Sequence, residues 1–189
     1  MGQLPQIFTR GSHNIMVLYD YNSNAILAIF MKSQHKSELL RACVQLHEYL
    51  TNCWLKPVQQ RLDNKAPHTL KWSMMQQQVK YQLVPPHIHC CSAVEQAIAT
   101  FKEHFVAELC TTDKQFLLQL WDYLLPQAAL TLNLLHDLHL NPHLSAYKQL
   151  NSTHNFNKLP LAPPGTKVIV HVKHRYANHG RHMVSMDDM

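Results

Sequence analysis

Charged residues are scarce in this sequence. Asp, Glu, Lys and Arg make up 15% of its 189 residues, whereas about a quarter is usual for a soluble domain. Asn, Gln and fifteen His supply much of the remaining polarity. Seventeen Lys and Arg against twelve Asp and Glu give a formal charge of +5. This charge suits a polyanionic partner without demonstrating one, because the basic residues are scattered along the chain.

The sequence also lacks the marks of secretion and of membrane insertion. Its five cysteines are odd in number and have no framework spacing, and the first ten residues, MGQLPQIFTR, have no apolar core like that of a signal peptide. The most apolar stretch, 116–140, is interrupted by Asp122 and Asn133 before it reaches the roughly 20 residues that span a bilayer. We therefore expect an intracellular protein, nuclear or cytoplasmic, with no membrane contact.

Hydrophobic periodicity predicts alternating strands and helices. Two β-rich runs, 14–21 and 25–32, are joined by the turn residues Asn22-Ser23-Asn24, which predicts a hairpin. Further along, the apolar spacing predicts a helix over 37–54, a strand over 57–62, a helix over 66–78, a strand over 79–84, and helices over 93–109 and 113–135. Pro126 should kink the last helix. The alternation indicates an α/β fold in which helices cover a sheet.

The chain changes character after residue 150. Residues 1–150 are expected to form one domain. Residues 151–189 are expected to form a Pro-rich connector, one strand over 166–172, and a tail without periodicity, which predicts disorder.

Two carboxylates stand where a sheet edge could bring them together. Asp63 follows the strand predicted over 57–62, and Glu95 lies in the first turn of the helix predicted over 93–109. Phosphoryl transfer by two Mg²⁺ ions needs carboxylates that hold both cations about 3.5–4 Å apart. Spacing alone favours simpler roles: Ser92-Ala93-Val94-Glu95 fits a capping box, and Asp63 can end a strand and favour the start of the next helix.

Two other features could bind ligands. Lys102 lies seven residues after Glu95 on the same side of the predicted helix, where a DNA backbone could run, although a solvated lysine is the commoner case. His87-Ile88-His89-Cys90-Cys91 has residue types that bind zinc. Four ligands from five consecutive residues would strain a tetrahedral site, so a flexible loop is favoured over a zinc site.

Two blocks of the sequence resemble a known family. RLDN at 61–64 and YQLVPPHIHCCSAVEQAIATFKEHF at 81–105 together resemble the second and third blocks of the DDE integrases of long-terminal-repeat retrotransposons, in which Asp-Asn-Gly precedes a helix that carries the last catalytic Glu. The flanking stretches VLYDYNSNAIL, LWDYLLPQAALTLNLL and LAPPGTKVIVHVK resemble one retroelement group. The resemblance covers nearly the whole chain.

The resemblance implies a ribonuclease H-like mixed sheet flanked by helices. It implies that Asp63 and Glu95 are the second and third metal-binding carboxylates, that Mg²⁺ or Mn²⁺ is the cofactor, and that DNA is the partner, contacted by Lys102. It further implies that copies of the chain can associate. The implied ancestral reaction is the metal-dependent attack of a DNA 3′-hydroxyl on target phosphodiesters.

Some residues depart from the family pattern. Asp20 resembles the aspartate that ends the family's second strand, whereas the first catalytic aspartate lies on the preceding strand, before a segment that residues 1–5 match. We therefore expect the first strand and the first catalytic aspartate to be missing, the metal to bind weakly and strand transfer to be impaired. Lys65 and Gln96 replace a usual glycine and arginine. The alternative is a non-catalytic nucleic-acid-binding or interaction module of the same fold.

Overall fold

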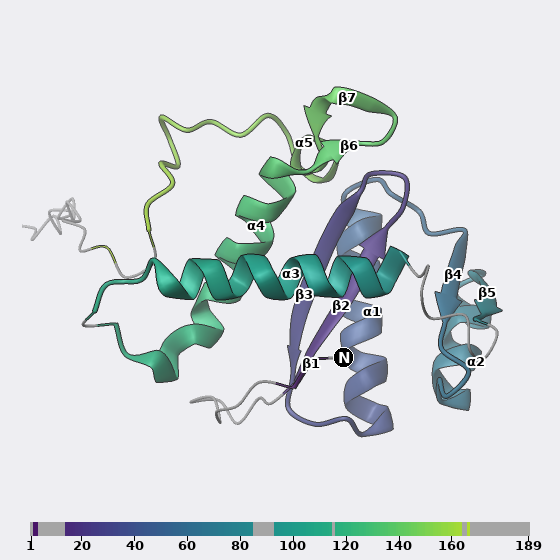
Figure 1. The fold of residues 1–189 in the computed structure, drawn as a ribbon. Coiled ribbons are helices and arrows are strands. Elements are labelled where there is room, and N and C mark those ends of the chain that lie inside the picture. Colours follow the sequence, from purple (N-terminus) through teal and green to yellow (C-terminus); the bar gives the residue numbers. More distant parts are fainter. Residues whose placement is uncertain (1, 4–13, 85–92, 115, 164–165, 167–189) are drawn as a thin grey trace, which may run out of the picture.

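The structure, a computed structural model, describes residues 2–3, 14–84, 93–114, 116–163 and 166 (Figure 1). Its elements in chain order are β1 (Gly2–Gln3), β2 (Asn14–Asp20), β3 (Ala25–Met31), α1 (Lys36–Asn52), β4 (Gln59–Leu62), α2 (His68–Gln76), β5 (Lys80–Leu83), α3 (Ala93–Cys110), the 3₁₀-helix η1 (Leu118–Leu124), α4 (Leu125–Leu135), β6 (Asp137–Leu138), β7 (Asn141–Ser145) and α5 (Ala146–Leu150). In this part of the chain no helix is both long enough and apolar enough to cross a membrane.

The predicted hairpin is confirmed and forms the centre of the fold. β2 and β3 pair antiparallel over their full lengths, from Asn14 opposite Met31 to Asp20 opposite Ala25. The carboxylate of Asp20 closes the turn: its Oδ2 accepts hydrogen bonds from the backbone N–H of Ser23 at 3.0 Å and from the Ser23 hydroxyl at 2.5 Å. Such a local bond competes well with extended structure and ends the strand.

Helices cover both faces of this hairpin, as the alternation of elements predicts. Because strand side chains alternate between faces, Ile15 and Ile26 pack with Phe101 and Phe105 of α3 and with α4. The opposite face packs against α1 and α2 in one cluster and against α1 and α5 in another. Figure 1 shows α3 crossing in front of the hairpin and α1 behind it. The helix that the apolar spacing predicts over 93–109 is therefore confirmed, with Phe101 and Phe105 on its buried face.

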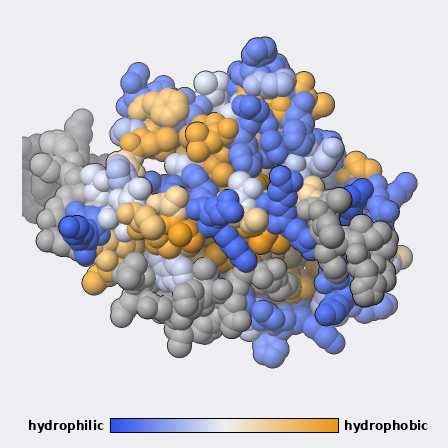
Figure 2. Space-filling model, in the orientation of Figure 1, coloured by the Kyte–Doolittle hydropathy of each residue, from blue (hydrophilic) through white to orange (hydrophobic). Residues whose placement is uncertain are grey.

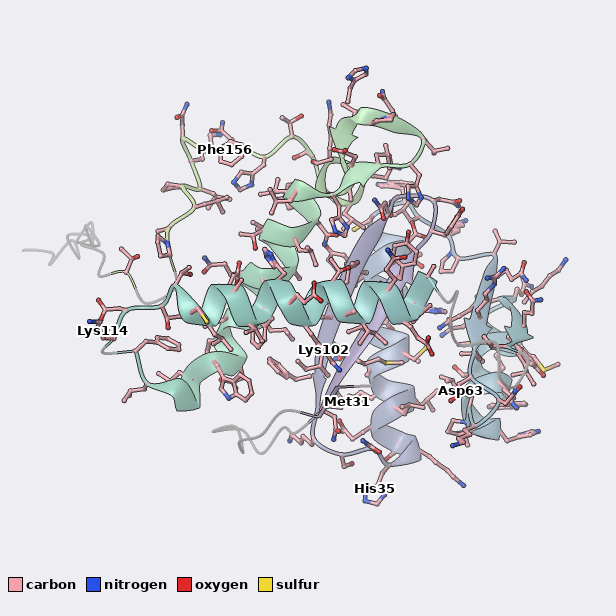
Figure 3. The ribbon with its side chains drawn as sticks, in the orientation of Figure 1. Met31, His35, Asp63, Lys102, Lys114 and Phe156 are labelled. Carbon is pink, nitrogen blue, oxygen red and sulfur yellow. The ribbon has the colours of Figure 1, made fainter. Side chains whose placement is uncertain are left out.

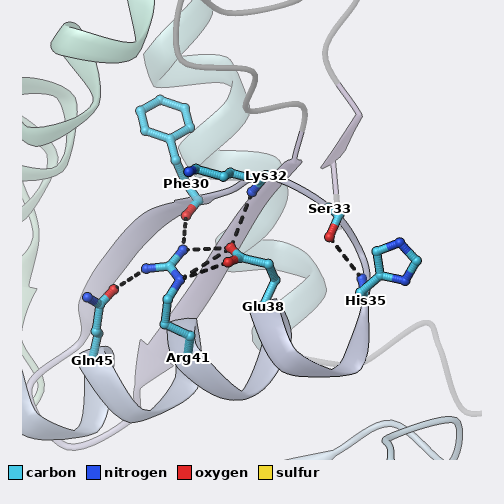
Figure 4. A network of polar contacts seen from close by, with 7 residues as sticks. All are labelled: Phe30, Lys32, Ser33, His35, Glu38, Arg41 and Gln45. Atoms are coloured by element: carbon cyan, nitrogen blue, oxygen red, sulfur yellow. Dashed lines mark hydrogen bonds and ion pairs between the residues drawn. The ribbon is translucent and has the colours of Figure 1, made fainter.

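Two side chains cover the outer edge of β3. Asn133 of α4 hydrogen-bonds both the N–H and the C=O of Ile26, each at 2.8 Å. Arg41 of α1 donates to the Phe30 carbonyl at 3.1 Å while it pairs with Glu38 at 2.9 Å (Figure 4). The hydrogen bond from Arg41 holds the pKa of Glu38 below its usual value. Unpaired strand edges invite association, so this cover helps to isolate the sheet.

β4 and β5 form a second, separate sheet. They pair in parallel, from Gln59 beside Lys80 to Leu62 beside Leu83, with α2 as the crossover. β1 pairs antiparallel with β2. The expected mixture of parallel and antiparallel pairing is present, but among the described residues no ladder joins the two sheets. The expectation about the family's first strand stays a prediction.

One predicted element is wrong. Residues 113–135 do not form one long helix kinked at Pro126. A 3₁₀-helix over Leu118–Leu124 is followed by α4, and Pro126 lies in the first turn of α4. Proline is favoured there because the first helical N–H groups have no partner within the helix. Sequence reasoning also missed β6, β7 and α5.

Residues 151–163 leave α5 and return toward the C-terminal end of α3 as a segment without a helix or strand, with a turn at 156–158 (Figure 1). Gln127 of α4 holds this segment by donating from Nε2 to the Ala162 carbonyl at 2.8 Å. The strand predicted over 166–172 lies outside the described residues except for Thr166, as does the tail after it. The loop predicted at 87–91 lies outside them too.

Candidate active site

Asp63 lies directly after β4, as predicted. Leu62, the last residue of the strand, is buried among side chains of α1 and α2, while Asp63 is exposed. The chain then turns, because the Asp63 carbonyl accepts from the Ala66 N–H at 2.9 Å and its Oδ1 from the Lys65 N–H at 3.5 Å. The buried Leu62 and the turn after it place the Asp63 carboxylate in solvent at the end of β4 (Figure 3).

A polar contact centred on the buried side chain of His47 joins β4 to α1. The imidazole of His47, on α1, lies between two amides: Nε2 is 2.5 Å from Oε1 of Gln60 on β4, and Nδ1 is 3.3 Å from Oε1 of Gln77 after α2. His47 is 5% exposed. The buried imidazole thus meets one half-buried amide, Gln60, and one exposed amide, Gln77, and a buried polar group is stable only where it has such partners. The three side chains, which we call the His47 latch, therefore fix β4 and α2 against α1.

Cys43, on the same helix as His47, also contacts the His47 latch. Cys43 lies one turn before His47, is buried, and hydrogen-bonds Gln60. Burial raises the pKa of the Cys43 thiol to about 11, which keeps it in the neutral form. Sequence reasoning missed all of these residues. Their signal was the placement of His47 on the apolar stripe of α1, where a polar side chain needs partners.

Glu95 lies in the first turn of α3, again as predicted, and is exposed. In Figure 1 this end of α3 is directed toward the side of the molecule that carries β4 and β5. Ser92, the predicted capping residue, lies outside the described residues, as does the zinc candidate at His87–Cys91. A negative charge in the first turn also favours the helix through its dipole.

The approach of Asp63 to Glu95 stays a prediction. Within the described residues, no three His, Cys, Asp or Glu side chains gather in a group that could hold a metal ion. Asp20 is at the end of the hairpin strand, as expected, and its Oδ2 is used by Ser23. The described residues thus include two exposed carboxylates, one directly after β4 and one in the first turn of α3.

Lys102 lies on the exposed side of α3, two turns after Glu95 (Figure 3). The charges beside it are mainly negative, because Glu95 and Glu103 are exposed on the same helix. One lysine among two carboxylates makes a weak surface for phosphate. Its role in binding DNA stays a prediction.

Comparisons with known proteins bear on the fold. No protein-family model matches the sequence, and no curated protein matches it. Solved structures do match. A chain of the simian T-cell lymphotropic virus intasome, in complex with PP2A regulatory subunit B56 gamma, aligns with a TM-score of 0.61 at 17% identity, over 91% of this chain and 58% of that one. The HTLV-2 integrase catalytic core domain, a trimeric form in complex with magnesium, aligns with a TM-score of 0.55 at 17% identity, over 74% of this chain and 84% of that one.

The catalytic core domain of BIV integrase aligns with a TM-score of 0.54 at 15% identity, over 76% of this chain and 87% of that one. This chain has the fold of a retroviral integrase catalytic core. The ribonuclease H-like fold expected from the sequence is therefore confirmed. The integrase-core likeness is one of fold, and this chain spans 58% of the length of the simian virus chain.

Proposed function

We propose that this chain acts on DNA as an integrase core, with Asp63 and Glu95 as ligands for Mg²⁺ or Mn²⁺. One observation carries the proposal: in a chain with the integrase-core fold, one carboxylate directly follows β4 and another lies in the first turn of α3. The retrotransposon origin rests on the resemblance of the sequence blocks around these two residues. The neighbouring HTLV-2 core is a complex with magnesium, which supports the choice of cation.

The residues present fit such a cation in kind. Asp63 and Glu95 are exposed carboxylates with oxygen donors, and Mg²⁺ prefers oxygen ligands and keeps several waters. Bound there, the cation would polarise a phosphodiester and stabilise the charge that develops on it. This chain would hold the two carboxylates in place by two sets of contacts. The His47 latch joins β4, which precedes Asp63, to α1, and α3, which carries Glu95, packs on the hairpin.

The proposed reaction is joining of a DNA 3′-hydroxyl to a target strand, and we expect this 189-residue chain to perform it poorly. Two-metal chemistry needs ligands for both ions, and two carboxylates leave one cation under-coordinated. Lys102 would contact a phosphate beside the site. The exposed glutamates around it predict weak DNA binding, since each lost phosphate contact removes counterion release.

We also propose that copies of the chain associate. HTLV-2 integrase cores occur in a dimeric and a trimeric form. Such assembly would place several DNA-facing surfaces side by side. The competing function is a non-catalytic nucleic-acid-binding or interaction module of the same fold.

A Mn²⁺ titration followed by electron paramagnetic resonance would test the proposed site. Asp63→Asn and Glu95→Gln should each weaken binding about tenfold or more, because each removes a charged ligand. Glu103→Gln is the matched control, since it neutralises an exposed glutamate on the same helix. Equal affinity in all four proteins would contradict the metal site.

Joining of pre-processed DNA ends, with Mg²⁺ or Mn²⁺, tests the reaction itself. We expect negligible product from purified, monodisperse protein. Glu95→Gln controls for contaminating nucleases. Robust joining that disappears in Glu95→Gln would show that the chain is a complete enzyme and that our expectation of impairment is wrong.

A further inference from the structure

The positive charge of the chain is concentrated in residues 138–186, because acidic residues are absent there. Residues 138–186 contain no Asp or Glu, but they contain Lys148, Lys158, Lys167, Lys173, Arg175 and Arg181. In residues 1–137, eleven Lys and Arg are nearly balanced by ten Asp and Glu. The basic residues are spread along the whole chain, whereas ten of the twelve acidic residues lie in residues 1–137. A polyanion would therefore meet least repulsion along the C-terminal part of the sequence.

Within the described part of that region, three rings pack in series. The Tyr147 ring of α5 lies edge to face with His154, with centroids 5.5 Å apart and planes at 83°. His154 in turn lies edge to face with Phe156, at 4.5 Å and 74°. Tyr147 and His154 are partly buried, whereas Phe156 is 57% exposed. We call these three rings the aromatic stack.

Backbone hydrogen bonds hold the exposed ring in place. Oδ1 of Asn155 accepts from the N–H groups of Asn157 at 3.0 Å and Lys158 at 3.1 Å, and the Asn155 carbonyl accepts from Leu159 at 2.9 Å. His154 Nε2 lies 3.1 Å from the Leu159 carbonyl. This turn fixes the backbone on both sides of Phe156 before any ligand arrives, which lowers the entropy cost of binding.

The surface around the stack combines apolar and basic groups. Leu159 and Leu161, which follow Phe156 in the same segment, are exposed at 63% and 44%, and Figure 2 shows a hydrophobic patch over this segment, at the upper left of the view. Lys158 is exposed two residues after Phe156, and Lys148 is exposed one residue after Tyr147. Figure 3 shows Phe156 projecting at the rim of the molecule.

We infer that the aromatic stack binds an unpaired base of single-stranded nucleic acid, with Phe156 as the stacking ring and Lys148 and Lys158 as phosphate contacts. Aromatic rings set among basic residues are the usual platform for such strands, because every base has a π-face and every nucleotide carries a phosphate. An acidic or neutral apolar protein segment would contact the exposed leucines, but its binding would not depend on the aromatic ring of Phe156. The inference shares its nucleic-acid partner with the proposed function and does not depend on the metal site.

Fluorescence anisotropy with labelled oligo-dT and oligo-rU, in EDTA, tests the inference on the full chain. Phe156→Ala should weaken binding by about fivefold to a hundredfold, and Phe156→Trp should keep or strengthen it. Trp72→Ala is the matched control, because Trp72 is also 57% exposed, on α2. It should leave binding unchanged.

Phe156→Leu separates base stacking from apolar contact. It should bind as weakly as Phe156→Ala if the ring is the contact. Wild-type affinity in Phe156→Leu, equal losses in Phe156→Ala and Trp72→Ala, or no binding of single strands at all would each overturn the inference. Because EDTA removes the metal, failure here leaves the Mn²⁺ titration untouched. Failure of that titration equally leaves the effect of Phe156→Ala intact.

Discussion

The side-chain amide of Asn133 takes the place of a neighbouring strand for Ile26. Its Oδ1 accepts the Ile26 N–H and its Nδ2 donates to the Ile26 carbonyl, both at 2.8 Å, while Nδ2 also reaches the Ala129 carbonyl at 2.8 Å. Asn133 is 3% exposed. α4 is thereby attached to the edge of the central hairpin by bonds that an apolar residue could not make.

Asn133→Leu should destabilise the fold by about 3 kcal/mol, because it leaves a buried N–H and a buried C=O of Ile26 without partners, at about 1–3 kcal/mol each. Urea unfolding followed by circular dichroism measures this. Asn64→Leu, at an exposed position after β4, should change the free energy of unfolding by less than about 0.5 kcal/mol. Similar losses in the two variants would show that the Asn133 bonds carry no special weight.

His47→Leu should loosen the sheet that carries Asp63 more than it loosens the hairpin. Without the imidazole, the half-buried amide of Gln60 loses its partner, whereas the exposed amide of Gln77 can turn to water, so the loss should be about 1 kcal/mol. Hydrogen exchange should accelerate at β4 and β5 before β2 and β3 are affected. Glu48→Leu, at the next and exposed position of α1, is the control. Uniform acceleration over both sheets would contradict the role of the His47 latch.

Cys43 should make stability fall in alkaline solution. Burial raises its pKa from the ordinary 9.0 to about 11 in the folded state, so the folded state holds the proton more tightly. The contribution is complete below pH 9 and is lost as pH rises from about 9 to about 11, at roughly 1.4 kcal/mol per pH unit. Cys43→Ala should reduce this slope in urea titrations run at several pH values. An unchanged slope would rule out Cys43 as its source.

Asp20 should matter for the hairpin and not for metal. Asp20→Asn keeps an acceptor for Ser23 but removes its charge, so stability should fall by about 1 kcal/mol. Mn²⁺ affinity should stay at the wild-type value in the same resonance titration. Loss of Mn²⁺ binding in Asp20→Asn, alongside its loss in Asp63→Asn, would show that Asp20 completes the site and that the alignment of its strand is wrong.

Local pattern predicted the elements whose partners are near in sequence. Turn residues and β-rich runs indicated the hairpin, and spacing of three and four indicated the stripe through Phe101 and Phe105. Pro126 was misread because a proline inside an apolar run predicts a kink as readily as a helix start, and the 3₁₀ turn before it has no distinct pattern.

The contacts that join elements could not be predicted in the same way. Asn133 and Ile26 are 107 residues apart, and His47 meets Gln60 and Gln77 only because α1, β4 and α2 pack together. For the candidate site, the sequence located Asp63 and Glu95 at the ends of their elements. Their separation depends on how α3 and β4 are placed, which periodicity does not encode.

Crystals of the chain soaked in Mn²⁺, with data collected for anomalous scattering, test the central claim most directly. The account predicts a peak bonded to carboxylate oxygens of both Asp63 and Glu95, at the roughly 2.0–2.6 Å typical of hard cations with oxygen ligands. Carboxyl groups more than about 10 Å apart, too far to share a metal pair of the spacing that two-metal catalysis needs, with no peak between them, would contradict it.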